Sequence, residues 1–200
     1  TDGSGGRLPP TEIEAFVVKL LCDSDEGVAA SIERLRRSGM GAEALLLDLL
    51  APAAMRLGSL WEDDQCDFAT VTLGVARLQC HMRTLSASFH AEEVTPQHDL
   101  RVLLCATPGE THLFGLSMTA EFFRRDGWDV VMPKDGETPS VEQCVQQQWV
   151  DVLGVTVSAP DRIAALRELI DAARQHSRNP DLVVLVGGPL MAQAPRWAFE

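Results

Sequence analysis

Arg101-Val102-Leu103-Leu104-Cys105-Ala106 is a short apolar run, and the loop sequence Thr107-Pro108-Gly109-Glu110-Thr111-His112-Leu113 follows it directly. A run of this length, bounded by turn residues, is typical of a buried strand in a parallel sheet. The apolar residues that begin at Phe114 predict a helix after the loop. The sequence therefore predicts that Glu110 and His112 lie at the carboxyl edge of a sheet, which is where open α/β sheets bind ligands.

A histidine at such an edge is a candidate metal ligand. An imidazole can act as an axial ligand, and a carboxylate two residues earlier can hold its other nitrogen and fix the tautomer. We therefore take His112 as the metal ligand and Glu110 as its orienting group, while Gly115 would let a planar ligand approach. The alternative is structural: a solvent-facing His112, a Glu110 favoured by the helix dipole, and a Gly115 that is a simple packing contact.

The sequence around this loop alternates short apolar strands with helical segments. From residue 100 onward we expect strands at Arg101–Ala106, Trp128–Met132, Asp151–Val157 and Asp181–Val186. This alternation predicts a doubly wound parallel sheet of the flavodoxin-like kind over residues 100–200. Because the chain stops where the helix after the fourth strand should be, we expect this domain to be incomplete, without a fifth βα unit.

The preceding residues, 10–93, show a helical period throughout. We expect helices that begin at a capping box over Thr11–Glu14, near Gly27, near Ala42 and after Asp67, with a kink at Pro52. Four helices with short connections predict a four-helix bundle, and residues 1–9 are expected to be a linker. The fold class is therefore α plus α/β.

Composition excludes several function classes. The 200 residues carry a net charge of −12, which argues against direct nucleic-acid binding. The five cysteines form no C-x-x-C pair, and the chain has no G-x-S-x-G, phosphate-loop or zinc-protease motif. We expect no enzyme and no membrane span, and the Gly/Ser-rich start without an initiator Met suggests a cytoplasmic fragment of a longer protein.

The spacing acid-x-His-x-x-Gly from Glu110 to Gly115 resembles the lower-ligand motif of cobalamin-binding domains, Asp-x-His-x-x-Gly, with Glu in place of Asp. In that family, a Ser after the third strand and a Gly-Gly pair after the fourth line the slot for the cofactor's nucleotide tail. A Trp at the end of the third bundle helix covers the upper face. The resemblance implies these cofactor-binding roles for Ser158, Gly187, Gly188 and Trp61, with turn chemistry and bundle packing as alternatives.

Besides Glu in place of Asp, two more departures separate the chain from the cobalamin-binding pattern. Ala159-Pro160 follows Ser158, and Val71-Thr72 stands where the family's light-responsive members carry Glu-His. The pattern is most similar to the cobalamin-binding-like domains of the AppA family of photosynthesis antirepressors, described as sensors containing haem instead of cobalamin. Haem needs no tail slot, so the departures favour it over cobalamin.

This resemblance implies a regulatory sensor domain that binds a tetrapyrrole through His112 and controls photosynthesis genes in response to light and redox state. It also implies a transcriptional repressor protein as partner and a flavin photoreceptor domain in the same chain. Haem is the expected cofactor, with cobalamin or none as alternatives. Two other functions stay open: a corrinoid-carrier domain of a methyltransferase and a cofactor-free protein-interaction domain.

Overall fold

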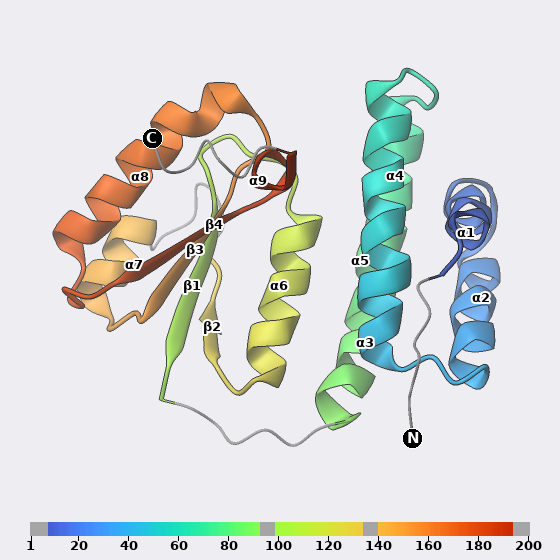
Figure 1. The fold of residues 1–200 in the computed structure, drawn as a ribbon, viewed down its shortest axis with the longest axis horizontal. Helices are drawn as coiled ribbons and strands as arrows, with labels where there is room; N and C mark the ends of the chain where they lie inside the picture. Colours follow the sequence, from blue (N-terminus) through green and yellow to red (C-terminus); the bar gives the residue numbers. More distant parts are fainter. Residues whose placement is uncertain (1–7, 93–98, 134–139, 194–200) are drawn as a thin grey trace. The chain divides into compact units, whose positions relative to one another are not determined.

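The computed structural model describes residues 8–92, 99–133 and 140–193. The chain divides into two compact units, Thr1–Glu93 and Val94–Glu200, here called the helical unit and the α/β unit. Figure 1 shows helices alone in the first unit and a sheet flanked by helices in the second. The fold class expected from the sequence is confirmed.

The helical unit consists of helices packed around leucine and phenylalanine side chains. Leu20, Leu45, Leu49, Leu57 and Phe89 are fully buried in its core. The segments are α1 (Pro10–Cys22), α2 (Asp25–Arg37), α3 (Ala42–Ala44), the π-helical segment η1 (Leu45–Leu50), α4 (Ala51–Glu62) and α5 (Phe68–Glu92).

The first residues of α1 and α5 test the two helix starts predicted from capping residues. The predicted capping box at Thr11 is wrong, because α1 already begins at Pro10 and Pro9 occupies the cap position without a side-chain hydrogen bond. Proline suits a first helical position, where its missing N–H needs no partner. Asp67 caps α5 as expected, since its Oδ1 accepts a hydrogen bond from Thr70 N at 2.9 Å.

Pro52 changes the helix differently from the expected kink. The six residues Leu45–Leu50 before it form a π-helical segment, and Ala51 N donates to Leu46 O, five residues back. A proline ring crowds the carbonyl four residues earlier, so a wider turn just ahead of it relieves that contact.

By length and composition alone, Ala42–Glu62 could cross a membrane, but core helices of soluble proteins share this composition.

The α/β unit contains a parallel sheet with strand order β2-β1-β3-β4 among the described residues. All four strands begin and end at most two residues from the predicted bounds. The strands are β1 (Arg101–Ala106), β2 (Asp129–Val131), β3 (Val152–Thr156) and β4 (Val183–Gly187). The helices are α6 (Phe114–Arg125), α7 (Val141–Gln147), the 3-10 turn η2 (Pro160–Arg162), α8 (Ile163–His176) and α9 (Pro189–Gln193).

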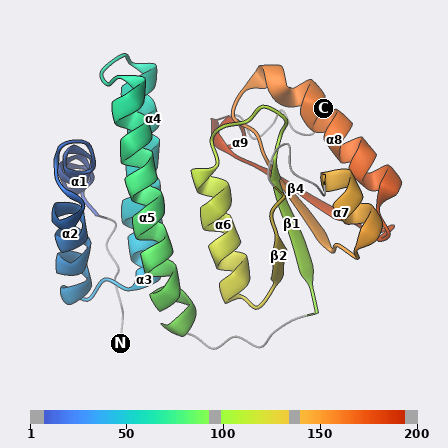
Figure 2. The same ribbon diagram turned by 180° about the vertical axis from the view of Figure 1, so that it is seen from behind.

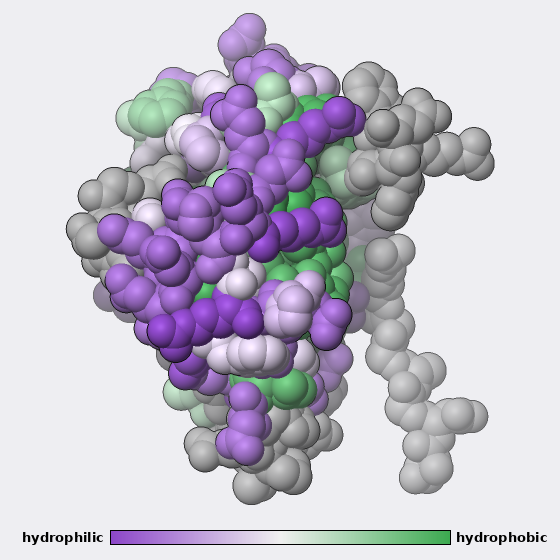
Figure 3. All heavy atoms as spheres, turned by 90° about the vertical axis from the view of Figure 1, so that its left-hand side faces the viewer, coloured by the Kyte–Doolittle hydropathy of each residue, from purple (hydrophilic) through white to green (hydrophobic). Residues whose placement is uncertain are grey.

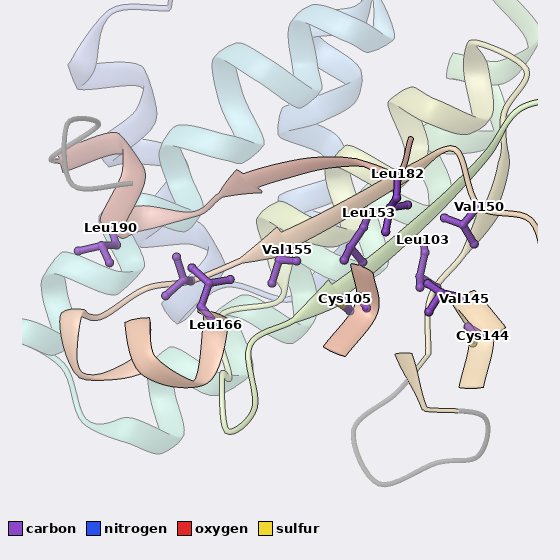
Figure 4. Packing of buried hydrophobic residues seen from close by; sticks show 12 residues of the cluster. Leu103, Cys105, Cys144, Val145, Val150, Leu153, Val155, Leu166, Leu182 and Leu190 are labelled. Atoms are coloured by element: carbon purple, nitrogen blue, oxygen red, sulfur yellow. The ribbon is translucent and has the colours of Figure 1, made fainter. Parts of the chain in front are cut away.

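Helices cover both faces of this sheet, as Figures 1 and 2 show from opposite sides. On one face, Leu103, Leu153 and Val155 belong to a buried cluster that includes side chains of α7 and α8 (Figure 4). The side of the molecule on which α7 and α8 lie is mostly hydrophilic outside (Figure 3), as expected for helices with one buried face.

The other face of the sheet packs against α6. Val102 and Leu104 of β1 are buried there with Leu116 and Ala120 of α6. Leu104 also leans over Gly154 of the neighbouring strand, because a Cβ at Gly154 would lie only 2.5 Å from Leu104 Cδ2. A glycine in the middle of β3 is therefore explained by a close side-chain approach.

The strand order places the candidate site. Because β2 and β3 pair with opposite sides of β1, the chain reverses its winding between β1 and β3. The loops that leave the carboxyl ends of these two strands lead to helices on opposite faces, which opens the position that α/β sheets use for ligands. The first loop carries Glu110 and His112, and the second carries Ser158.

Candidate cofactor-binding site

The carboxylate of Glu110 joins the two loops at the switch point. Its side chain is fully buried, and its Oε1 accepts hydrogen bonds at 2.8 Å from Thr111 N and from His112 N. Oε1 also lies 2.7 Å from His112 Nδ1. Oε2 accepts a hydrogen bond at 2.8 Å from Ser158 N in the loop after β3. The extra methylene of Glu relative to Asp therefore lets one carboxylate bind its own loop and the neighbouring loop together.

These contacts fix the charge of Glu110 and the tautomer of His112. Burial alone would raise the pKa of Glu110, but the hydrogen bonds from Ser158 and His112 outweigh it and lower the pKa from 4.5 to about 2. An ionised carboxylate only accepts, so His112 Nδ1 carries the hydrogen. The lone pair of His112 Nε2 is then available to bind a metal. The His112 side chain is 49% exposed, so a ligand can reach this nitrogen.

Arg162 is a site residue that the sequence analysis missed. Its Nη1 donates to Pro108 O at 3.2 Å, and its Nε lies 4.0 Å from Glu110 Oε2. Nε is buried without a hydrogen-bond partner among the described residues. Gly109, which has a positive φ of 77°, makes room for the guanidinium, since a Cβ there would lie 2.8 Å from Nη1. An arginine in the turn after Pro160 gives no sequence signal for this contact.

The three predicted glycines differ in what surrounds them. A Cβ at Gly115 or Gly187 would meet nothing within 4 Å, so these two positions leave open space beside the backbone. Gly188 has a positive φ of 104°, and a Cβ there would lie 2.5 Å from Val157 O. Gly188 is therefore needed for the turn after β4, whereas Gly115 and Gly187 are free to admit a ligand.

Ser158 contacts the dyad of Glu110 and His112 through its backbone, because its N–H donates to Glu110 Oε2. Gly187 is brought close to the same loop, since its carbonyl accepts from Val157 N at 2.9 Å. Pro160 begins the 3-10 turn that leads into α8, which gives the departure after Ser158 a structural reason. Glu110 thus contacts both His112 and Ser158, and Gly187 lies beside Val157, the residue before Ser158.

Trp61 belongs to the helical unit and lies near the end of α4. Its side chain is 46% exposed, so the alternative that it is a bundle-core residue is wrong. A half-exposed tryptophan at a helix end is free to contact a ligand or a partner. Its role as a cover for the upper face of a cofactor stays a prediction.

The donor set fits a metal that brings most of its own ligands. The described residues hold no group of three or more His, Cys, Asp or Glu side chains that could bind a metal ion. His112 therefore offers one imidazole nitrogen rather than a cage. A tetrapyrrole suits this arrangement, because its ring fills four coordination positions and leaves an axial position for histidine. The open space at Gly115 and Gly187 agrees with a bulky ligand.

Comparison with known proteins gives a relative, a structural neighbour and a family. An uncharacterized 20.5 kDa protein in the bchF-crtJ intergenic region of Rhodobacter capsulatus is 25% identical over 161 residues, 80% of this chain and 83% of the relative. The monomethylamine corrinoid protein of Methanosarcina barkeri shares the fold with a TM-score of 0.69 at 13% identity, covering 90% of this chain and 83% of that one. The B12 binding domain family matches residues 100–200. The chain therefore belongs to the B12 binding domain family.

Proposed function

We propose that the α/β unit binds a corrinoid through Nε2 of His112. The observation that carries this proposal is the 2.7 Å contact between His112 Nδ1 and the buried carboxylate of Glu110. It holds the imidazole in the tautomer that binds a metal, in a chain whose α/β half matches the B12 binding domain family. Corrinoid is proposed in place of haem, the cofactor expected from the sequence, because this family is the one that matches.

The residues around His112 have different roles in the proposed site. Glu110 orients the imidazole and ties its loop to Ser158. Gly115 and Gly187 leave room beside the backbone, and Gly188 shapes the turn after β4. A bound corrinoid would supply a metal that exchanges axial ligands and changes its oxidation state.

We infer further that the domain is a sensor rather than an enzyme. This role comes from the resemblance to photosynthesis antirepressors, which implies a repressor protein as partner, a flavin photoreceptor domain in the same chain, and responses to light and redox state. The net charge of −12 supports a basic protein partner. A pull-down at low and high salt with the cognate repressor tests this role, and no complex at low salt would contradict it.

An absorbance titration with hydroxocobalamin tests cofactor binding. Haemin is titrated in parallel, because the antirepressor resemblance makes haem the competing ligand. His112→Ala removes the proposed ligand, and His176→Ala at the end of α8 is the matched control. We expect saturable cobalamin binding in the wild type and the control, and loss of the histidine-ligated spectrum in His112→Ala.

The other outcomes point to the competing functions. A Soret shift with haemin and no response to hydroxocobalamin would replace the corrinoid by haem. Binding of neither ligand would contradict the proposal and favour a cofactor-free interaction domain. Methyl transfer between partner proteins by the cobalamin-loaded chain would contradict the sensor role and favour a corrinoid carrier.

A further inference from the structure

The two oxygens of Glu110 are used unequally. Oε1 contacts Thr111 N, His112 N and His112 Nδ1, whereas Oε2 accepts one hydrogen bond from the described residues, from Ser158 N. Arg162 lies beside Oε2, with its Nε 4.0 Å away, buried and without a partner among the described residues. Glu110 Oε2 can accept another hydrogen bond and Arg162 Nε can donate one, but the distance between them is about 1 Å longer than a normal hydrogen bond.

The arginine is held at this position by its surroundings. Nη1 is fixed by Pro108 O, and Gly109 leaves the space that the guanidinium occupies. The Arg162 side chain is 28% exposed, so its charge is partly shielded from water. Because a guanidinium stays ionised, a positive charge lies permanently beside the carboxylate that orients His112.

This charge acts against metal binding by His112. A carboxylate on Nδ1 increases the donor strength of Nε2, and a cation beside that carboxylate reduces the effect. The same cation also repels a positively charged metal complex at His112. Both effects have the same sign.

We propose that Arg162 is a positioning residue that acts through Glu110 to weaken the bond between His112 and the bound metal. This inference rests on the proposed function. The result is a histidine ligand that can leave the metal and return, as a sensor of metal oxidation state or of a competing axial ligand requires.

A purely structural role for Arg162 predicts the opposite result. If Arg162 only clamped the loops through Pro108 O, its loss would loosen the site and weaken ligation. If its charge tempers Glu110, its loss tightens ligation, because Glu110 keeps three backbone N–H donors and His112 in place. The sign of the change separates the two roles.

The test is an absorbance titration with diaquocobinamide, which has no nucleotide base of its own and must take its axial nitrogen from the protein. Arg162→Gln is expected to bind roughly three- to tenfold more tightly than wild type. Arg162→Lys keeps a positive charge and is expected to stay within about twofold of wild type. Arg167→Gln, on the exposed side of α8, is the matched control.

Two further arms complete the experiment. In a Glu110→Gln background, the gain from Arg162→Gln should become smaller, because the effect through the carboxylate is lost and only the direct repulsion of the metal complex remains. Should Arg162→Gln fail to fold, Arg162→Met keeps the apolar stem and tests the same sign. Equal or weaker ligation in the charge-free variants would overturn the inference while leaving cofactor binding intact. Failure of the wild type to ligate diaquocobinamide would overturn the proposed function itself.

Discussion

Replacing Glu110 by Gln tests the electrostatic account of the dyad. The amide has the size of the carboxylate but only one acceptor oxygen. If that oxygen replaces Oε1, the amide NH2 points at the N–H of Ser158, which loses its acceptor. The variant therefore keeps the shape of the site and removes both its charge and the bond between the two loops.

The magnitude follows from the pKa of Glu110. A decrease from 4.5 to about 2 corresponds to about 3 kcal/mol of stabilisation at neutral pH. Because the folded pKa is depressed, this stabilisation is fully present above pH 4.5 and is lost as pH falls from 4.5 towards 2. An unpaired N–H at the partly buried Ser158 costs at most about 1–3 kcal/mol, which adds to this loss.

The assay is native-state hydrogen exchange read on the amides of β1 and β3, which report the α/β unit alone. Wild type and Glu110→Gln are compared at neutral pH and at several values below pH 4.5. We expect a difference of about 3 kcal/mol at pH 7 that shrinks as the pH falls. A difference below about 1 kcal/mol at pH 7, or one independent of pH, would refute the reasoning.

Four further substitutions test individual positions. Gly188→Ala should destabilise the α/β unit by about 2 kcal/mol or more in thermal unfolding, whereas Gly187→Ala should stay within about 0.5 kcal/mol, since only the former combines positive φ with a clash at Val157 O. Gly115→Ala should stabilise α6 by about 0.5–1 kcal/mol yet weaken hydroxocobalamin binding; unchanged binding would exclude Gly115 from the ligand's path. Asp67→Ala should cost the helical unit about 1 kcal/mol, measured by urea unfolding, through loss of the α5 cap.

The parts of the fold that sequence could predict are those set by local pattern. The run Arg101–Ala106 has the composition of a buried parallel strand, and the structure gives it the same bounds. The change near residue 100 from a helical period to short apolar runs predicts a helical region followed by an α/β region. The capping box predicted at Thr11 is wrong because it competes with a proline at the first helical position for the same helix start, and the helix begins at Pro10.

Contacts between distant residues are what the sequence could not supply. The motif spacing predicted that Glu110 holds His112, since the two residues are neighbours in one loop. That Glu110 also binds Ser158, 48 residues later, depends on β1 and β3 being adjacent. The position of Arg162 depends on the same strand order and on the conformation of Gly109.

The close approach of Leu104 to Gly154 couples the residue types that β1 and β3 can carry at these two positions. Any side chain at 154 must displace Leu104 Cδ2, which lies 2.5 Å from the position of the missing Cβ. Alanine at 154 requires the Leu104 methyl to rotate away, whereas a larger residue at 154 should favour a smaller or differently branched residue at 104. Leu104 belongs to the layer between the sheet and α6. The packing of α6, which begins just after His112, therefore depends on which residues β1 and β3 carry at positions 104 and 154.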